Sequence, residues 1–79
     1  MDPHEVEIGK PYRNARAGFD IRIVPSVEYL GRPGSPFALQ TRLDAQAPWT
    51  HPFSPCATAA KARQELVHYL NDVKHPSLR

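Results

Sequence analysis

A single amphipathic segment near the C-terminus is the feature that most constrains how this chain can fold. Across residues 59–73, apolar side chains recur at the spacing of one face of an α-helix. Charged and polar side chains lie off this stripe, so the helix needs an apolar surface to cover. His75 and Pro76 end the helix, and either Ser54 with Pro55 or Thr58 caps its start. The stripe consists of Ala59, Ala62, Leu66, Tyr69, Leu70 and Val73.

Three segments before the helix alternate between apolar and polar residues, as β-strands do. The first spans residues 19–29 and contains Pro25, the second spans residues 37–45, and the third is the short stretch 49–53. Residues 31–35 read Gly-Arg-Pro-Gly-Ser and predict a type II turn, because the proline presets φ at the second turn position and the glycine after it accepts a positive φ. The first two segments therefore form a hairpin.

The prolines set the expected order of the strands. Proline has no amide hydrogen to donate to a ladder, so the segments with Pro25 and Pro52 belong at the edges and segment 37–45 in the centre. The expected fold is α+β: a three-stranded antiparallel meander of order 1-2-3 with the C-terminal helix on one face (β-β-β-α). The other face is expected to be open to water or to a partner. The predicted core comprises Phe19, Ile21, Ile23, Leu39, Leu43, Trp49, Phe53, Leu66, Tyr69, Leu70 and Val73.

A length of 79 residues allows one small domain, which we expect over residues 18–75. Residues 1–17 are predicted to be a flexible or loosely attached segment ending in a loop at 12–17, and residues 76–79 a frayed C-terminus. The single cysteine cannot form an internal disulfide. No apolar run approaches the roughly 20 residues of a membrane helix, and the first residues do not resemble a signal peptide. We therefore expect a cytoplasmic protein that does not bind membranes.

No pattern in the sequence indicates catalysis, a metal or another cofactor. The carboxylates show no spacing that pairs an acid with a base, and the four histidines show no ligand spacing. The proline in segment 31–35 would remove an amide that a phosphate loop requires. Cys56 is expected to be a small buried filler, with an activated thiolate at the helix start as the alternative. The sequence thus predicts a protein that is not an enzyme and has no cofactor.

Basic side chains are concentrated in the first half of the chain, although the formal net charge is only +2. Residues 10–42 contain six lysines and arginines, whereas residues 1–9 contain three carboxylates and neither basic type. The ordinary interpretation is a solvated surface in which Asp20 pairs with an arginine across the sheet. The alternative is a partner-binding or anion-binding face formed by Arg13, Arg16, Arg22, Arg32, Gln40 and Arg42.

These features lead to two hypotheses of function. The first is a small non-catalytic interaction module that binds another protein, or a second copy of itself, through its open sheet face or an edge strand, because exposed strand edges are ready pairing surfaces. The alternative is a weak nucleic-acid binder that contacts phosphates through the arginine-bearing face and loops. No aromatic residue is expected on the arginine-bearing face. This favours the interaction module, because single-stranded nucleic acids stack on exposed rings.

Overall fold

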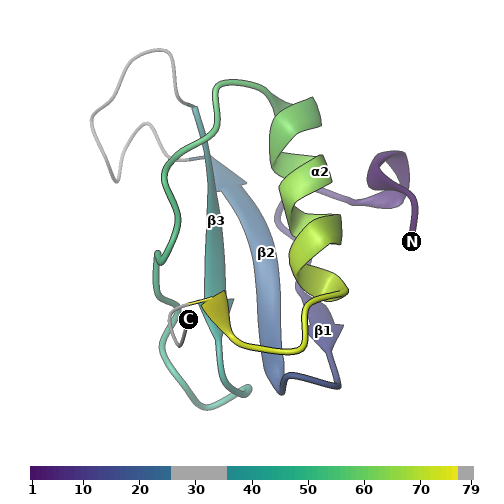
Figure 1. The fold of residues 1–79 in the computed structure, drawn as a ribbon. Helices are drawn as coiled ribbons and strands as arrows, with labels where there is room; N and C mark the ends of the chain where they lie inside the picture. The colour runs from purple at the N-terminus through teal and green to yellow at the C-terminus, as the bar shows by residue number, and fades with distance from the viewer. Residues whose placement is uncertain (26–35, 77–79) are drawn as a thin grey trace.

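The computed structural model describes residues 1–25 and 36–76, and it shows a sheet covered on one face by a helix (Figure 1). The strands are antiparallel in the order β1-β2-β3. The predicted β-β-β-α architecture, with the C-terminal helix packed on the sheet, is confirmed. The elements are the 3-10 helix η1 (Pro3–Glu5), strands β1 (Tyr12–Asn14), β2 (Phe19–Pro25) and β3 (Phe37–Arg42), and helix α2 (Ala59–Leu70).

The three strands are not the three that the sequence pattern indicated. Residues 12–14, which were predicted to be part of a loop, form the edge strand β1, and this places β2 rather than β3 in the centre. Pro25 is compatible with that position because it is the last residue of β2. A strand of three residues is too short to show a period of two, so its sequence carried no strand signal.

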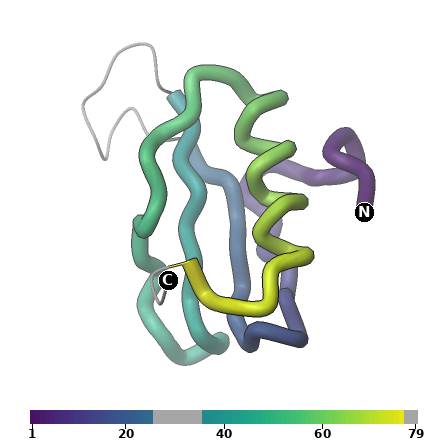
Figure 2. The backbone as a smooth tube through the Cα atoms, in the orientation of Figure 1, coloured from purple at the N-terminus to yellow at the C-terminus, as the bar shows by residue number. Residues whose placement is uncertain are grey.

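The predicted third strand, residues 49–53, contributes only an isolated bridge between Thr50 and Thr41. A second bridge joins Cys56 to Phe37, so residues 50–56 span the same stretch of sheet edge as residues 37–41. Two extra residues must bulge out between the bridges, and the two prolines there, at 52 and 55, have no amide hydrogen for a ladder. The segment from 43 to 58 therefore follows the edge of β3 without forming a strand (Figure 2).

Several predictions concern residues outside the described ranges. These predictions are the type II turn at 31–35, the continuation of the first strand over 26–29 and the end of the chain at 77–79. They stay predictions.

Helix α2 begins after Thr58, the second of the two caps predicted from the sequence. Thr58 is the N-cap, and its Oγ1 accepts a hydrogen bond from the amide of Lys61 at 3.1 Å. The helix ends at Leu70 rather than at residue 73, because Asn71 already makes tighter C-terminal bonds to the carbonyls of His68 and Tyr69. Val73 lies beyond the helix and is exposed, contrary to its predicted place in the core.

The core lies between α2 and the sheet and contains fewer residues of the 43–53 segment than predicted. Leu43 is 56% exposed, and Trp49 lies on the opposite face of the sheet. Phe53 packs against the core from its margin, with its ring centroid 4.5 Å from that of Tyr69. The buried apolar cluster consists of Val6, Phe19, Ile21, Ile23, Leu39, Cys56, Ala62 and Leu66.

Residues before Gly18 contribute to this packing. Val6 belongs to the buried cluster, and its carbonyl accepts a hydrogen bond from Nε of Arg63 on α2 at 3.2 Å. The amide of Gly9 donates to the carbonyl of Ile23 at 2.7 Å, which continues the pairing of β2 beyond β1. The packed layer therefore begins well before residue 18, where the sequence had placed the domain boundary.

A buried asparagine connects the sheet to the end of the helix. Nδ2 of Asn14 donates to the carbonyls of Tyr69 at 2.9 Å and Asp72 at 2.6 Å. Its Oδ1 accepts from the amides of Arg16 at 3.1 Å and Ala17 at 3.0 Å. All the hydrogen-bonding groups of this side-chain amide are thus used, and they join the β1–β2 turn to the C-terminus of α2.

The chain after α2 returns to the sheet and buries His75, which is only 6% exposed. Its Nε2 lies 2.9 Å from Oγ1 of Thr41, and its ring meets that of Phe19 edge-on at 5.1 Å between centroids. Burial disfavours the charged imidazolium and lowers the pKa of His75 below its usual value. A helix stop was predicted at His75, but its burial was not.

We predict that Asn14→Ala destabilises the protein by about 2 kcal/mol or more, because each buried polar group left without a partner costs about 1–3 kcal/mol. The matched control is Asn71→Ala, which removes an exposed hydrogen bond from Nδ2 to the carbonyl of Val67. It should cost less than about 1 kcal/mol. Chemical denaturation of both variants measures the difference, and equal losses would contradict the role assigned to Asn14.

We also predict that stability decreases as the pH falls below the ordinary histidine value of about 6.5, because the unfolded state then binds a proton that buried His75 resists. The slope from this one group is at most about 1.4 kcal/mol per pH unit. His75→Gln should flatten the pH dependence of the melting temperature between about pH 7 and pH 5. His4→Gln is the control, since the side chain of His4 is exposed, and an unchanged slope in His75→Gln would refute the assignment.

Candidate functional site

The face of the sheet opposite α2, called the outer face here, carries four of the six residues that the sequence singled out. Alternation along the strands sends Phe19, Ile21 and Ile23 towards the helix, so their neighbours project the other way. The four predicted residues brought together on the outer face are Arg13 from β1, Arg22 from β2, and Gln40 and Arg42 from β3.

A row of three charged residues crosses the sheet at one end of this face. Arg13, Asp20 and Arg42 are direct cross-strand neighbours on β1, β2 and β3. Oδ1 of Asp20 accepts from Nη1 of Arg13 at 3.2 Å, and its Oδ2 accepts from Nε of Arg42 at 2.8 Å. Burial alone would raise the pKa of Asp20, but hydrogen bonds and charges from both arginines outweigh it and lower that pKa. The predicted cross-strand ion pair is present.

A second row contains Arg22, Gln40 and His51. Nε of Arg22 donates to Oε1 of Gln40 at 2.7 Å, which fixes the orientation of the glutamine amide. Nε2 of Gln40 then lies 3.2 Å from Nε2 of His51. Gln40 is only 3% exposed. The sequence had predicted an open outer face, but the burial of Gln40 shows that this face is partly covered.

Trp49 lies on the outer face against two of the arginines. The Cζ atoms of Arg22 and Arg42 are 4.0 and 4.4 Å from the centroid of its ring, within the range of cation–π attraction. The sequence had predicted Trp49 in the core and no aromatic side chain on this face. The bridge between Thr50 and Thr41 explains the difference, because Oγ1 of Thr50 lies 3.2 Å from Oγ1 of buried Thr41 and the residues flanking Thr50 must face the other way.

The remaining predicted site residues do not join these two rows. Arg16 is exposed in the turn after β1, where its amide bonds to the side chain of Asn14. Arg32 lies outside the described residues. The side chain of Arg13 reaches in addition to the carbonyl of Leu43, at 2.9 Å from Nη1, and is 48% exposed. Sequence reasoning thus found the arginines and missed Trp49 and His51.

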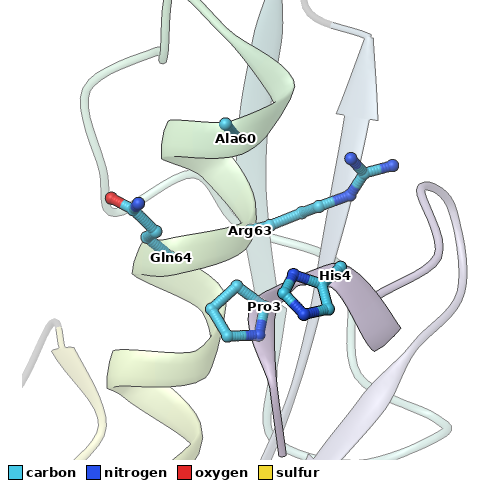
Figure 3. A pocket seen from close by; sticks show the side chains of 5 residues that line it. All are labelled: Pro3, His4, Ala60, Arg63 and Gln64. Carbon is cyan, nitrogen blue, oxygen red and sulfur yellow. The ribbon is translucent and has the colours of Figure 1, made fainter.

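A shallow hollow of about 160 Å³ lies elsewhere, between η1 and α2 (Figure 3). It is lined by Pro3, His4, Ala60, Arg63 and Gln64. Arg63 already donates to the carbonyl of Val6, and Nε2 of His4 lies 3.0 Å from Oδ1 of the exposed Asp2. Within residues 1–25 and 36–76, no group of three or more His, Cys, Asp or Glu side chains is placed to hold a metal ion.

Cys56 lies in the bridge to Phe37 rather than at the N-terminus of α2, and it is buried. Its Sγ donates to Oε2 of Glu65 at 3.4 Å. Burial, followed by the hydrogen bond and the negative charge of Glu65, raises the pKa of the thiol to about 11. This environment fits the predicted buried filler and disfavours a thiolate.

Comparison of the chain with protein-family models, with curated proteins and with solved structures gives no match. Among the described residues, no helix is both long enough and apolar enough to cross a membrane.

We predict that Cys56 reacts slowly with a thiol reagent in the folded protein near pH 8 and rapidly after denaturation, because only the thiolate is nucleophilic. Glu65→Gln removes the negative charge beside Sγ and should speed native labelling, while burial keeps it well below the denatured rate. Labelling rates against pH measure the effect. Native labelling as fast as denatured labelling would show that the thiol is accessible and ionised.

Proposed function

We propose that this chain is a small non-catalytic interaction module that binds another protein through the outer face of its sheet. One observation carries the proposal: the Trp49 ring lies against the guanidinium groups of Arg22 and Arg42 on a face that α2 does not cover. Tryptophan and arginine are the side chains that most often dominate the energy of protein interfaces. The side chain of Arg13, on the same face, is 48% exposed and adds charged area to this patch.

The edges of the sheet support the outer face as the binding surface. The edge of β3 that does not pair with β2 is bridged at Phe37 and Thr41 by the chain's own residues 50–56. At the other edge of the sheet, β1 has only three residues. Addition of a partner strand needs a longer run of unpaired backbone groups. Binding through an edge strand, the other route in our hypothesis, is therefore less well supported.

The proposal involves no cofactor and no catalytic step, and it places the protein in the cytoplasm, where a lone thiol such as Cys56 stays reduced. The partner is another protein or a second copy of this chain. Light scattering over a range of concentrations separates these cases, because only self-association makes the apparent mass rise with the concentration of pure protein.

Nucleic-acid binding is a second candidate that one observation favours. Trp49 beside two arginines supplies the aromatic side chain that the sequence appeared to lack on this face, and such pairs can stack on bases and neutralise phosphates. Against it, Asp20 lies between Arg13 and Arg42, and the formal net charge of the chain is only +2. Protein binding therefore has the stronger support.

Gel-shift titration at about 50 mM salt decides between the candidates, since phosphate contacts are strongest at low salt. We predict that the wild-type protein and the double variant Arg22→Ala with Arg42→Ala are equally silent towards duplex and single-stranded DNA. If the protein does bind DNA through these arginines, the slope of log affinity against log salt should flatten by about two in the double variant.

Binding to protein is tested by capture from a nuclease-treated extract of the native cell. A partner should be retained by the wild type and lost with Arg42→Glu, which reverses a charge beside Trp49. The matched control is Lys61→Glu, which makes the same charge change at an exposed side chain of α2 and should retain the partner. Retention by both variants would refute binding through the outer face.

A further inference from the structure

We propose that the outer face binds an extended acidic segment of the partner protein, whose carboxylates pair with Arg13 and Arg42 and whose apolar side chain packs on Trp49. This inference rests on the proposed function and specifies the chemistry of the partner.

The two guanidinium groups flank a single carboxylate that satisfies only part of their capacity. Neighbouring strands are about 4.8 Å apart, so the backbones of Arg13 and Arg42 are separated by about 10 Å with Asp20 between them. Asp20 accepts from one nitrogen of each arginine, Nη1 of Arg13 and Nε of Arg42. Within the described part of the chain, no acceptor bonds to either terminal nitrogen of Arg42 or to Nη2 of Arg13. These donors are left for water or for a ligand.

Both arginines are accessible to a partner to different degrees. The side chain of Arg13 is 48% exposed and that of Arg42 is 22% exposed. Arg42 is also held in place, because its Nε is bonded to Asp20 and its guanidinium lies on the Trp49 ring. A guanidinium that is already oriented loses less conformational freedom when it binds a carboxylate.

The charge of the face calls for an anion. Among the described residues, Arg13 and Arg42 share one carboxylate, that of Asp20. Asp44, in the loop that follows β3, turns its Oδ1 towards the amides of Gln46 and Ala47, at 2.8 and 2.9 Å. The planar donors of arginine match a carboxylate in a two-point hydrogen-bonded pair.

An apolar group beside the arginines makes a peptide a better fit than a simple anion. The ring of Trp49 lies against the guanidinium of Arg42 and is partly exposed. A segment that combines glutamate or aspartate with a leucine-like residue can reach the arginines and cover the Trp49 ring in one contact. A nucleic-acid strand, which carries a charge on every nucleotide, would place phosphates against Asp20.

The test uses the fluorescence of Trp49, the only tryptophan in the chain and itself part of the site. The probe is a capped peptide, Ser-Glu-Leu-Glu-Ser-Gly-Glu-Leu-Glu-Ser, titrated into the full chain at about 50 mM salt, where charge pairing is only partly screened. We expect a saturable change in Trp49 emission that weakens as salt is added. The same peptide with glutamine in place of every glutamate should produce no saturable change.

Arg13→Gln and Arg42→Gln should each weaken peptide binding about tenfold, the effect of losing one charge-assisted contact. Lys61→Gln, which removes the same charge on the far side of the molecule, should change it less than about twofold. Thermal melting of each variant establishes that it is folded. Arg13→Gln keeps the test decisive if Arg42→Gln unfolds, because Arg13 is the more exposed of the two.

Three outcomes would overturn the inference: no response to the acidic peptide, an equal response to the glutamine peptide, or tighter binding of an oligothymidine strand that depends on the same arginines. The proposed function is judged separately. If the peptide fails but Arg42→Glu still abolishes capture of the native partner, the face binds a protein of other chemistry and only the inference is wrong. If Arg42→Glu also leaves capture unchanged, both are wrong.

Discussion

The packing of this small fold depends on the side-chain amide of Asn14. It is the point at which the sheet, the β1–β2 turn and the end of the helix meet, with four hydrogen bonds between 2.6 and 3.1 Å. A domain of this size has a net stability of only about 3–5 kcal/mol from its core, so one fully satisfied buried amide is a large part of what holds the layers in register. The strand β1 has only three residues, and the hydrogen bonds from Asn14 to the carbonyls of Tyr69 and Asp72 connect it directly to the chain at the end of α2.

The two ends of the chain complete this small core. Before β1, Val6 is buried and receives Arg63 from the helix, and after α2 the chain returns so that His75 packs on Phe19 and contacts Thr41. Neither Val6 nor His75 lies in a strand or an α-helix, so no periodic pattern in the sequence indicates their burial. Because a short chain buries a smaller share of its surface than a long one, apolar and polar groups from both ends are used to close the core.

On the outer face, the same arginines serve structure and the proposed binding. Arg13 holds the carbonyl of Leu43, while Arg22 and Arg42 hold the ring of Trp49, so these contacts fasten the segment after β3 onto the sheet. Contacts of this kind at the surface are individually weak, so each of them contributes little to folding. They do, however, present oriented guanidinium groups and an aromatic ring on one surface, and that arrangement is what makes the face suitable for recognition.

The sequence alone determined the parts of this protein that local periodicity controls. These are the helix around Ala62 and Leu66, the alternation of Phe19, Ile21 and Ile23, and hence the β-β-β-α class and the gathering of Arg22, Gln40 and Arg42 on one face. Periodicity shows which side of an element is apolar, but it cannot show which distant residues meet. Asn14 in strand β1 donates hydrogen bonds to the carbonyls of Tyr69 and Asp72, which lie 55 and 58 positions further along the chain. The buried ring of His75 contacts Thr41, which lies 34 positions before it. The face on which Trp49 lies follows from the pairing of Thr50 with Thr41, and a shift of one residue in that register would have turned it into the core. These features were decided by the tertiary structure, because register and long-range hydrogen bonds leave no periodic trace in the chain.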